Sequence, residues 1–192
     1  MLKIIITSFL ITITIASQAQ PALTEGAALL FKNTKSNSTV AEKNKLFIDL
    51  NFRISKDRKQ FVADGDDSKE FPFDVFVMPT DVNKDGQEEI FITFGNSYTS
   101  GSTGSSVLVF IKNAAGKYIP HLGFPGTTPE ALAVSNKGYP DLLIGGPGFE
   151  FPIWKWNGTG YVFSRKIKDS DYPALKKTSV EEISKTYTAA LK

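Results

Sequence analysis

The sequence contains no cysteine and only one histidine among its 192 residues. Without cysteine the chain can form no disulfide and has no thiol nucleophile, so packing and bound metal must supply its stability outside the cytoplasm. A single histidine excludes zinc sites built from several histidine ligands. That residue, His121, is the only imidazole base available to a Ser-His-Asp site, and its place beside Pro120 predicts a surface turn.

The sequence also lacks an excess of either charge. Lys and Arg number 22 against 20 Asp and Glu, a formal net charge of +2. This balance gives no electrostatic reason to expect binding to nucleic acid or to an anionic membrane surface. With 41% hydrophobic and 12% aromatic residues, the chain can build a core, and its length favours one compact domain over residues 20–192.

Long apolar runs are missing except near the N-terminus. The basic start Met1-Leu2-Lys3 precedes an apolar run from Ile4 to Ala16, and Ser17-Gln18-Ala19 places small residues before a cleavage point. This pattern predicts a signal peptide over residues 1–19, because the run is shorter than the roughly 20 apolar residues that span a bilayer. No cysteine follows the cut to carry a lipid. We therefore predict a secreted or periplasmic protein with no membrane span.

A short acidic stretch carries the clearest chemical signal. Oxygen donors stand at nearly alternate positions, and the backbone carbonyl of the fourth completes a set of five: Asp81, Asn83, Asp85, Gln87 and Glu89. Hard cations such as Ca²⁺ take six to eight oxygens at about 2.3–2.6 Å. Gly86 supplies the backbone freedom that a sharp turn requires. The stretch therefore predicts a Ca²⁺ site.

The same stretch has two other interpretations. An EF-hand would place a bidentate glutamate at loop position twelve, where this sequence has Ile92 inside an apolar run. A calcium loop that leads into a β-strand fits better. The alternative is a solvated hairpin turn, since Asp85-Gly86 is an ordinary turn signal.

Helices are expected at both ends of the mature chain. Thr39 and Glu42 form a capping-box signature that predicts a helix to about Asn51, with Val40, Phe47 and Leu50 on one side. A strand should follow, although residues 48–54 also alternate as a strand would. The second helix is expected in 169–192, capped by Thr178 or Ser179, and should pack on a sheet through one face: Val180, Ile183, Tyr187 and Leu191. Residues 20–70 form the N-terminal region, and residues 71–168 are predominantly strands.

The strand region repeats itself. A shift of 52 residues places Gly86 on Gly138 and Glu89 on Asp141, and the Asn113–Gly116 turn is echoed by 157–160. Such periods indicate repeated supersecondary units. In the second copy, three residues that cannot form the site replace the first three ligands: Ala133, Ser135 and Lys137. The second copy is therefore predicted not to bind calcium.

At these two segments the sequence resembles the FG-GAP (integrin-α-like) or VCBS-type calcium-loop repeat, a β-propeller blade motif. Asp81–Glu89 looks like its calcium loop, and 140–148 looks like the strand that ends in Gly-Ala-Pro. The resemblance implies an α+β, mainly β fold of two antiparallel β-meander units flanked by an N-terminal and a C-terminal helix. It implies the same five calcium ligands and a non-catalytic recognition module for a protein or a cell-envelope glycan.

Two segments are candidates for partner binding. Gly95–Ser106 is rich in small polar residues and is expected to form a flexible, exposed loop. Tyr98, Ser100 and Ser102 are its candidate contact residues. Trp154 and Trp156 share a strand face, where they would either stack on a sugar ring or fill the core.

Two other functions remain open from the sequence. An inhibitor or immunity protein could insert the 95–106 loop into a cell-wall-degrading enzyme. A carboxylate-dependent hydrolase could use Asp66 with Asp67, or Glu88 with Glu89. Because adjacent strand residues face opposite ways, Glu88 is expected to face solvent rather than to join Glu89.

Overall fold

The computed structural model describes residues 21–63, 71–146 and 150–192. Residues 1–20, 64–70 and 147–149 lie outside the described residues. The predicted signal peptide, the Asp66/Asp67 pair and part of the predicted 140–148 strand fall in these ranges.

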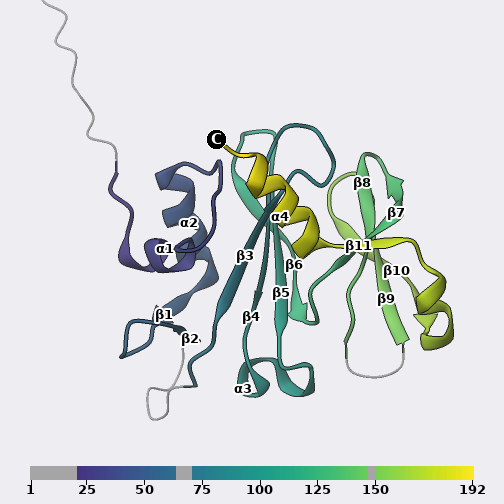
Figure 1. Ribbon diagram of the computed structural model, residues 1–192, viewed down its shortest axis with the longest axis horizontal. Coiled ribbons are helices and arrows are strands. Elements are labelled where there is room, and N and C mark those ends of the chain that lie inside the picture. Colours follow the sequence, from purple (N-terminus) through teal and green to yellow (C-terminus); the bar gives the residue numbers. More distant parts are fainter. Residues whose placement is uncertain (1–20, 64–70, 147–149) are drawn as a thin grey trace, which may run out of the picture.

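Two four-stranded antiparallel meanders form the body of the protein (Figure 1). The first contains, in order, β3 (Val75–Thr80), β4 (Glu89–Phe94), β5 (Ser106–Lys112) and β6 (Tyr118–Pro125). The second contains β7 (Glu130–Asn136), β8 (Tyr139–Leu143), β9 (Glu150–Trp156) and β10 (Tyr161–Lys168). The expected fold class, mainly β with two meander units and flanking helices, is confirmed.

Both meanders have the same kind of turn between their third and fourth strands. The side-chain oxygen of Asn113 accepts from the backbone N–H groups of Ala115 and Lys117, each at 3.0 Å. The side-chain oxygen of Asn157 likewise accepts from the N–H groups of Thr159 and Gly160. Asparagine favours such turns because its side chain mimics a backbone acceptor. The sequence repeat therefore corresponds to a structural repeat.

The N-terminal region packs on the outer face of the first meander. It comprises α1 (Glu25–Leu30), α2 (Val40–Leu50), β1 (Phe52–Ile54) and β2 (Phe61–Ala63). The predicted capping box is present. The Glu42 side chain accepts from the backbone N–H of Thr39, and the Thr39 hydroxyl oxygen accepts from the backbone N–H of Glu42. α2 ends at Leu50 and is capped by Asn51, which has a positive φ of 52°, and β1 follows. The prediction of a helix to about Asn51 followed by a strand is thus confirmed.

The buried face of α2 differs from the predicted one. Leu46 and Leu50 are buried in the cluster that covers the outer face of the first meander, whereas Val40 is 37% exposed. Val40 is the first helical residue, where the chain has just left the sheet surface. The prediction for Val40 was wrong because periodicity alone does not fix where a helix meets its neighbour.

The C-terminal segment joins the two meanders. After the 3-10 helix η2 (Asp169–Ala174), β11 (Lys177–Ser179) pairs with β7, and α4 (Val180–Ala190) lies against β3 (Figure 1). Ser179 caps α4, as predicted, and the helix packs on the sheet. β11 was not predicted. Leu191 follows the helix rather than belonging to its apolar face.

Three hydrophobic clusters fill the spaces between these elements. The largest lies between the two meanders and includes residues from both, such as Phe91 and Leu142, together with Val180 of α4. The second lies between the first meander and the N-terminal helices. The third covers the outer face of the second meander, where Tyr172 and Leu175 pack on Leu143 and Ile153. Each meander is therefore covered on both faces.

Candidate metal site

The candidate site is the loop between β3 and β4. The backbone N–H of Lys84 donates to the carbonyl of Asp81 at 3.3 Å, which curls the loop at its start. Lys84 and Gly86 both have positive φ, 60° and 84°. Gly86 adopts this conformation without the steric cost that a side chain imposes. The bend turns the side chains at its two ends toward each other.

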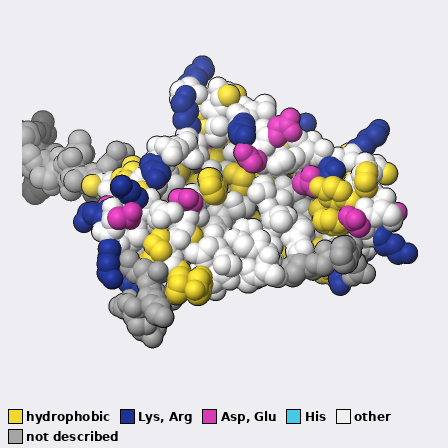
Figure 2. All heavy atoms as spheres, turned by 60° about the horizontal axis from the view of Figure 1, so that its bottom comes forward, with side chains coloured by type: hydrophobic (Ala, Val, Ile, Leu, Met, Phe, Trp, Pro, Cys, Tyr) yellow, Lys and Arg dark blue, Asp and Glu magenta, His cyan; other side chains and the backbone are white. Residues whose placement is uncertain are grey.

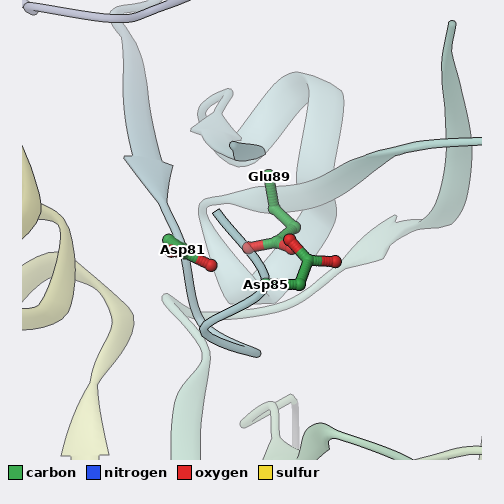
Figure 3. Close-up of side chains that lie close together, drawn as sticks. All are labelled: Asp81, Asp85 and Glu89. Atoms are coloured by element: carbon green, nitrogen blue, oxygen red, sulfur yellow. The ribbon is translucent and has the colours of Figure 1, made fainter. Parts of the chain in front are cut away.

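Three carboxylates meet in this bend. One oxygen from each of Asp81, Asp85 and Glu89 lies within 4.8 Å of the other two, and Figure 3 shows these groups converging. Two oxygens on opposite sides of one Ca²⁺ ion would stand about 4.6–5.2 Å apart, given the usual Ca–O distances. The spacing therefore suits ligands of a single divalent cation.

Asp81 has an oxygen that the protein leaves unpaired. Its Oδ2 accepts from the N–H of Gly86 at 3.1 Å. Its Oδ1 is buried and has no hydrogen-bond partner among the described residues. A buried carboxylate oxygen without a partner is costly, so a cation at this position would satisfy it.

Glu89 is the buried wall of the site, with its side chain only 1% exposed. Its Oε2 accepts from the N–H of Val82 at 2.8 Å, and its Oε1 accepts from the hydroxyl of Tyr139 at 3.3 Å. Burial, together with the negative charges of Asp85 and Asp81, raises the pKa of Glu89 to about 7, against the lowering effect of the Val82 N–H. A divalent cation would offset both the burial and the repulsion.

Asn83 and Gln87 order the loop around Asp85. The Asn83 side chain donates to Asp85 Oδ2 at 2.8 Å, and its oxygen accepts from the Asp85 N–H at 3.2 Å. The N–H of Gln87 donates to Asp85 Oδ1 at 2.7 Å. The structure thus brings three of the five predicted ligands together, and ligation through Asn83 and Gln87 stays a prediction.

The second meander has no such loop. Lys137 and Gly138, both at positive φ, form a tight turn between β7 and β8. Asp141, which corresponds to Glu89, is buried and accepts from the Asn136 side chain. Lys137 instead reaches the carbonyl of Asn157 at 2.6 Å. Among the described residues, the acidic cluster of the first meander has no counterpart here.

Glu88 does not face solvent, and that expectation is corrected. It is 4% exposed and accepts hydrogen bonds from the hydroxyl groups of Ser36 and Ser38 and from the N–H of Asn37, at 2.6–2.9 Å. Glu88 comes just before β4, and it does point to different partners from Glu89, as expected. Glu88 fixes the N-terminal segment to the first meander and is not free to act with Glu89 as an acid-base pair.

The 95–106 segment is folded rather than a flexible loop, contrary to expectation. It forms α3 (Ser97–Ser100) and the 3-10 helix η1 (Gly101–Thr103), and the Asn96 side chain donates to the carbonyls of Phe71 and Pro72. Ser100 is 2% exposed and its hydroxyl is hydrogen-bonded to that of Ser106, so the prediction of Ser100 as a contact residue is wrong. Ser102 is exposed, and Tyr98 is 70% exposed and stacked on Phe71.

The two tryptophans differ in accessibility. Trp156 is 8% exposed in the core between the meanders, so it cannot stack on a sugar ring at the surface. Trp154 is partly buried, stacks on Phe124, and has an indole N–H without a hydrogen-bond partner among the described residues. On the face shown in Figure 2, hydrophobic side chains form separate patches rather than one continuous area.

His121 lies in a strand rather than in a turn. It is a half-buried residue of β6, and its ring centroid is 5.2 Å from that of Trp156. Burial lowers its pKa. The prediction of a surface turn was wrong because β6 continues through Pro120 to Pro125.

Comparisons with protein-family models, curated proteins and solved structures found no match to this chain. Within the described ranges, no helix has both the length and the apolar character that crossing a membrane requires.

Proposed function

We propose that this chain is a secreted or periplasmic calcium-binding β-repeat protein of the FG-GAP-like kind, which acts in recognition rather than catalysis. The observation that carries the proposal is the convergence of Asp81, Asp85 and Glu89, with oxygens within 4.8 Å of one another. The unpaired buried oxygen of Asp81 supports it, because it offers a ligand atom that the protein itself does not use.

The two four-stranded meanders packed face to face support the repeat assignment. A propeller blade is a four-stranded antiparallel sheet, and blades pack through their faces. The acidic loop connects β3 to β4 and leads directly into a strand, which is the arrangement expected of the calcium loop that the sequence resembles. The ion would tie β3 to β4 and so contribute to folding stability.

A protein partner is favoured over a glycan by the aromatic residues. Trp156 is buried, whereas Tyr98 is exposed beside the folded 95–106 segment. Exposed tyrosines are frequent anchors in protein interfaces. The partner would therefore meet this end of the first meander.

The metal proposal is tested by calorimetric titration with Ca²⁺ and by thermal melts in Ca²⁺ and in chelator. A ligand at a hundred times its Kd stabilises the folded state by about 2.7 kcal/mol, so the melt should shift upward by several degrees. Mg²⁺ serves as the control, since it requires a smaller octahedral site. Identical melts in Ca²⁺ and in chelator, with no heat of binding, would remove the proposal.

A further inference from the structure

The outer edge of β3 is only partly covered. β3 pairs with β4 on one side and has no strand partner on the other among the described residues. Just before β3, Phe73 bonds with Phe61 of β2 on that free side, through two backbone hydrogen bonds of 2.9 and 3.1 Å. The hydroxyl of Thr34 then donates to the carbonyl of Val77 at 3.4 Å.

These bonds reveal which backbone groups point outward. In a strand, alternate residues present both their N–H and their C=O to the same side. Phe73 and Val77 both bond away from β4, so Val75 between them also faces outward. The N–H and C=O of Val75 and the N–H of Val77 therefore have no backbone partner in the described ranges. Pro79 has no N–H and ends this free edge.

A groove of about 1140 Å³ lies along this edge. Its lining includes residues 29–30, 32–35 and 59–61 on the N-terminal side, and Ser184 and Thr188 of α4 on the other. Phe76 is 63% exposed in the groove. Side chains two residues apart in a strand lie on the same face, so Phe76 shares the face of Met78. Met78 belongs to the cluster between the meanders, which also contains Val180 of α4, whereas Val77 belongs to the N-terminal cluster. Phe76 therefore lies on the α4 side of the edge.

The charges of the groove are unequal. Its lining contains four lysines, Lys32, Lys35, Lys59 and Lys185, against two acids, Asp74 and Glu181. Lys185 is paired with Glu181 at 2.7 Å. The amine groups of Lys32 and Lys35 donate to the backbone carbonyls of Lys59 and Leu191, and neither amine has an acidic partner among the described residues. The wall on the N-terminal side is therefore cationic.

We infer that the β3 edge binds an extended acidic peptide of a protein partner, which adds a strand at Val75–Val77. Main-chain bonds to a sheet edge give affinity, and side chains at alternate positions give specificity. The peptide would place apolar side chains on Phe76 and acidic ones toward Lys32 and Lys59. A second copy of this chain fits less well, because pairing two β3 edges would bring two cationic walls together. The inference names a partner class for the proposed recognition role and rests on that role.

The test uses the full mature chain and a short fluorescent peptide in which valine and glutamate alternate. Anisotropy titrations should show saturable binding that weakens as salt screens the lysines. A peptide with lysine in place of glutamate should bind at least about tenfold more weakly. Val75→Pro removes one outward N–H and leaves the ladder to β4 intact, so it should lower affinity by about tenfold or more.

A second variant covers the case in which Val75→Pro fails to fold. Lys32→Glu with Lys59→Glu should reverse the preference between the two peptides, and Lys155→Glu with Lys168→Glu on the other meander is the matched control. Absence of saturable binding, equal binding of both peptides by the wild type, or a dimer that Val75→Pro abolishes would each overturn the inference. Calcium affinity is measured in the same samples, so loss of calcium binding and loss of peptide binding are separate results.

Discussion

Asp85 is the ligand candidate whose side chain can be changed with least damage to the fold. It is exposed, whereas Glu89 is buried and bonded to Val82 and Tyr139. Asp85→Asn keeps the size of the side chain and removes one negative charge from the cluster.

We expect Asp85→Asn to lose most of the stabilisation that saturating Ca²⁺ gives the wild type, about 2 kcal/mol or more. Thermal melts with and without chelator measure it. Asp169→Asn, the same change at an exposed position outside the loop, should keep the full calcium shift. A calcium shift equal to that of the wild type would count against Asp85 as a ligand.

His121 gives the fold a dependence on pH. Burial lowers its pKa in the folded state, so the unfolded chain binds the proton more readily. Stability from this residue is therefore fully present above the unfolded pKa of about 6.5 and is lost as the pH falls below it.

Urea unfolding at pH 7 and pH 5 measures the free energy of unfolding and so checks this prediction. The wild type should lose more stability over this interval than His121→Gln, which cannot take up the proton. A parallel decline in both proteins would show that other groups carry the pH dependence.

Among the elements, one buried carboxylate adds a polar attachment to the hydrophobic cluster that holds the N-terminal segment on the first meander. Glu88 accepts from Ser36, Asn37 and Ser38, which lie about fifty residues earlier in the chain. Removing it would leave these donors without this partner, and the hydroxyl of Ser38 is buried.

Glu88→Ala should lower the free energy of unfolding by about 3 kcal/mol, because buried unpaired donors are costly. Chemical denaturation measures the change. Glu182→Ala, at an exposed position on α4, should change stability by less than about 0.5 kcal/mol. Similar effects of the two variants would contradict the role given to Glu88.

Local signals predicted the elements better than the contacts between them. The Thr39–Glu42 pair marked the start of α2, and Asp-Gly and Asn-Gly-type turns marked the hairpins. Nothing near Glu88 in the sequence indicates its burial, because its partners come from the 36–38 segment. The same reason applies to Ser100, whose partner Ser106 becomes available only when the 95–106 segment folds.

The predicted metal cluster was local as well. Asp81, Asp85 and Glu89 lie within nine residues, so their spacing already limits how they can meet. The free edge of β3 was not predictable, because it depends on how β2, Thr34 and α4 approach that strand from three distant parts of the chain.

At the scale of the whole molecule, α4 couples the two meanders. Val180 is fully buried in the cluster that both meanders share. Its side chain therefore contributes to the stability of both sheets together.

Val180→Ala should cost about 2 kcal/mol through the lost contacts and the cavity. Amide hydrogen exchange should show faster opening of β4 and β5 as well as of β8 and β9. Val162→Ala, at a 43% exposed position of β10, is the control. Faster exchange confined to one meander would contradict this coupling.

The covered outer faces have a consequence for how far such a stack can grow. The N-terminal helices close one side, and the segment around Tyr172 closes the other. A further four-stranded sheet could pack on either outer face only by displacing one of these covering segments. The two meanders therefore form a closed pair, since neither presents an uncovered outer face within the described residues to a third sheet.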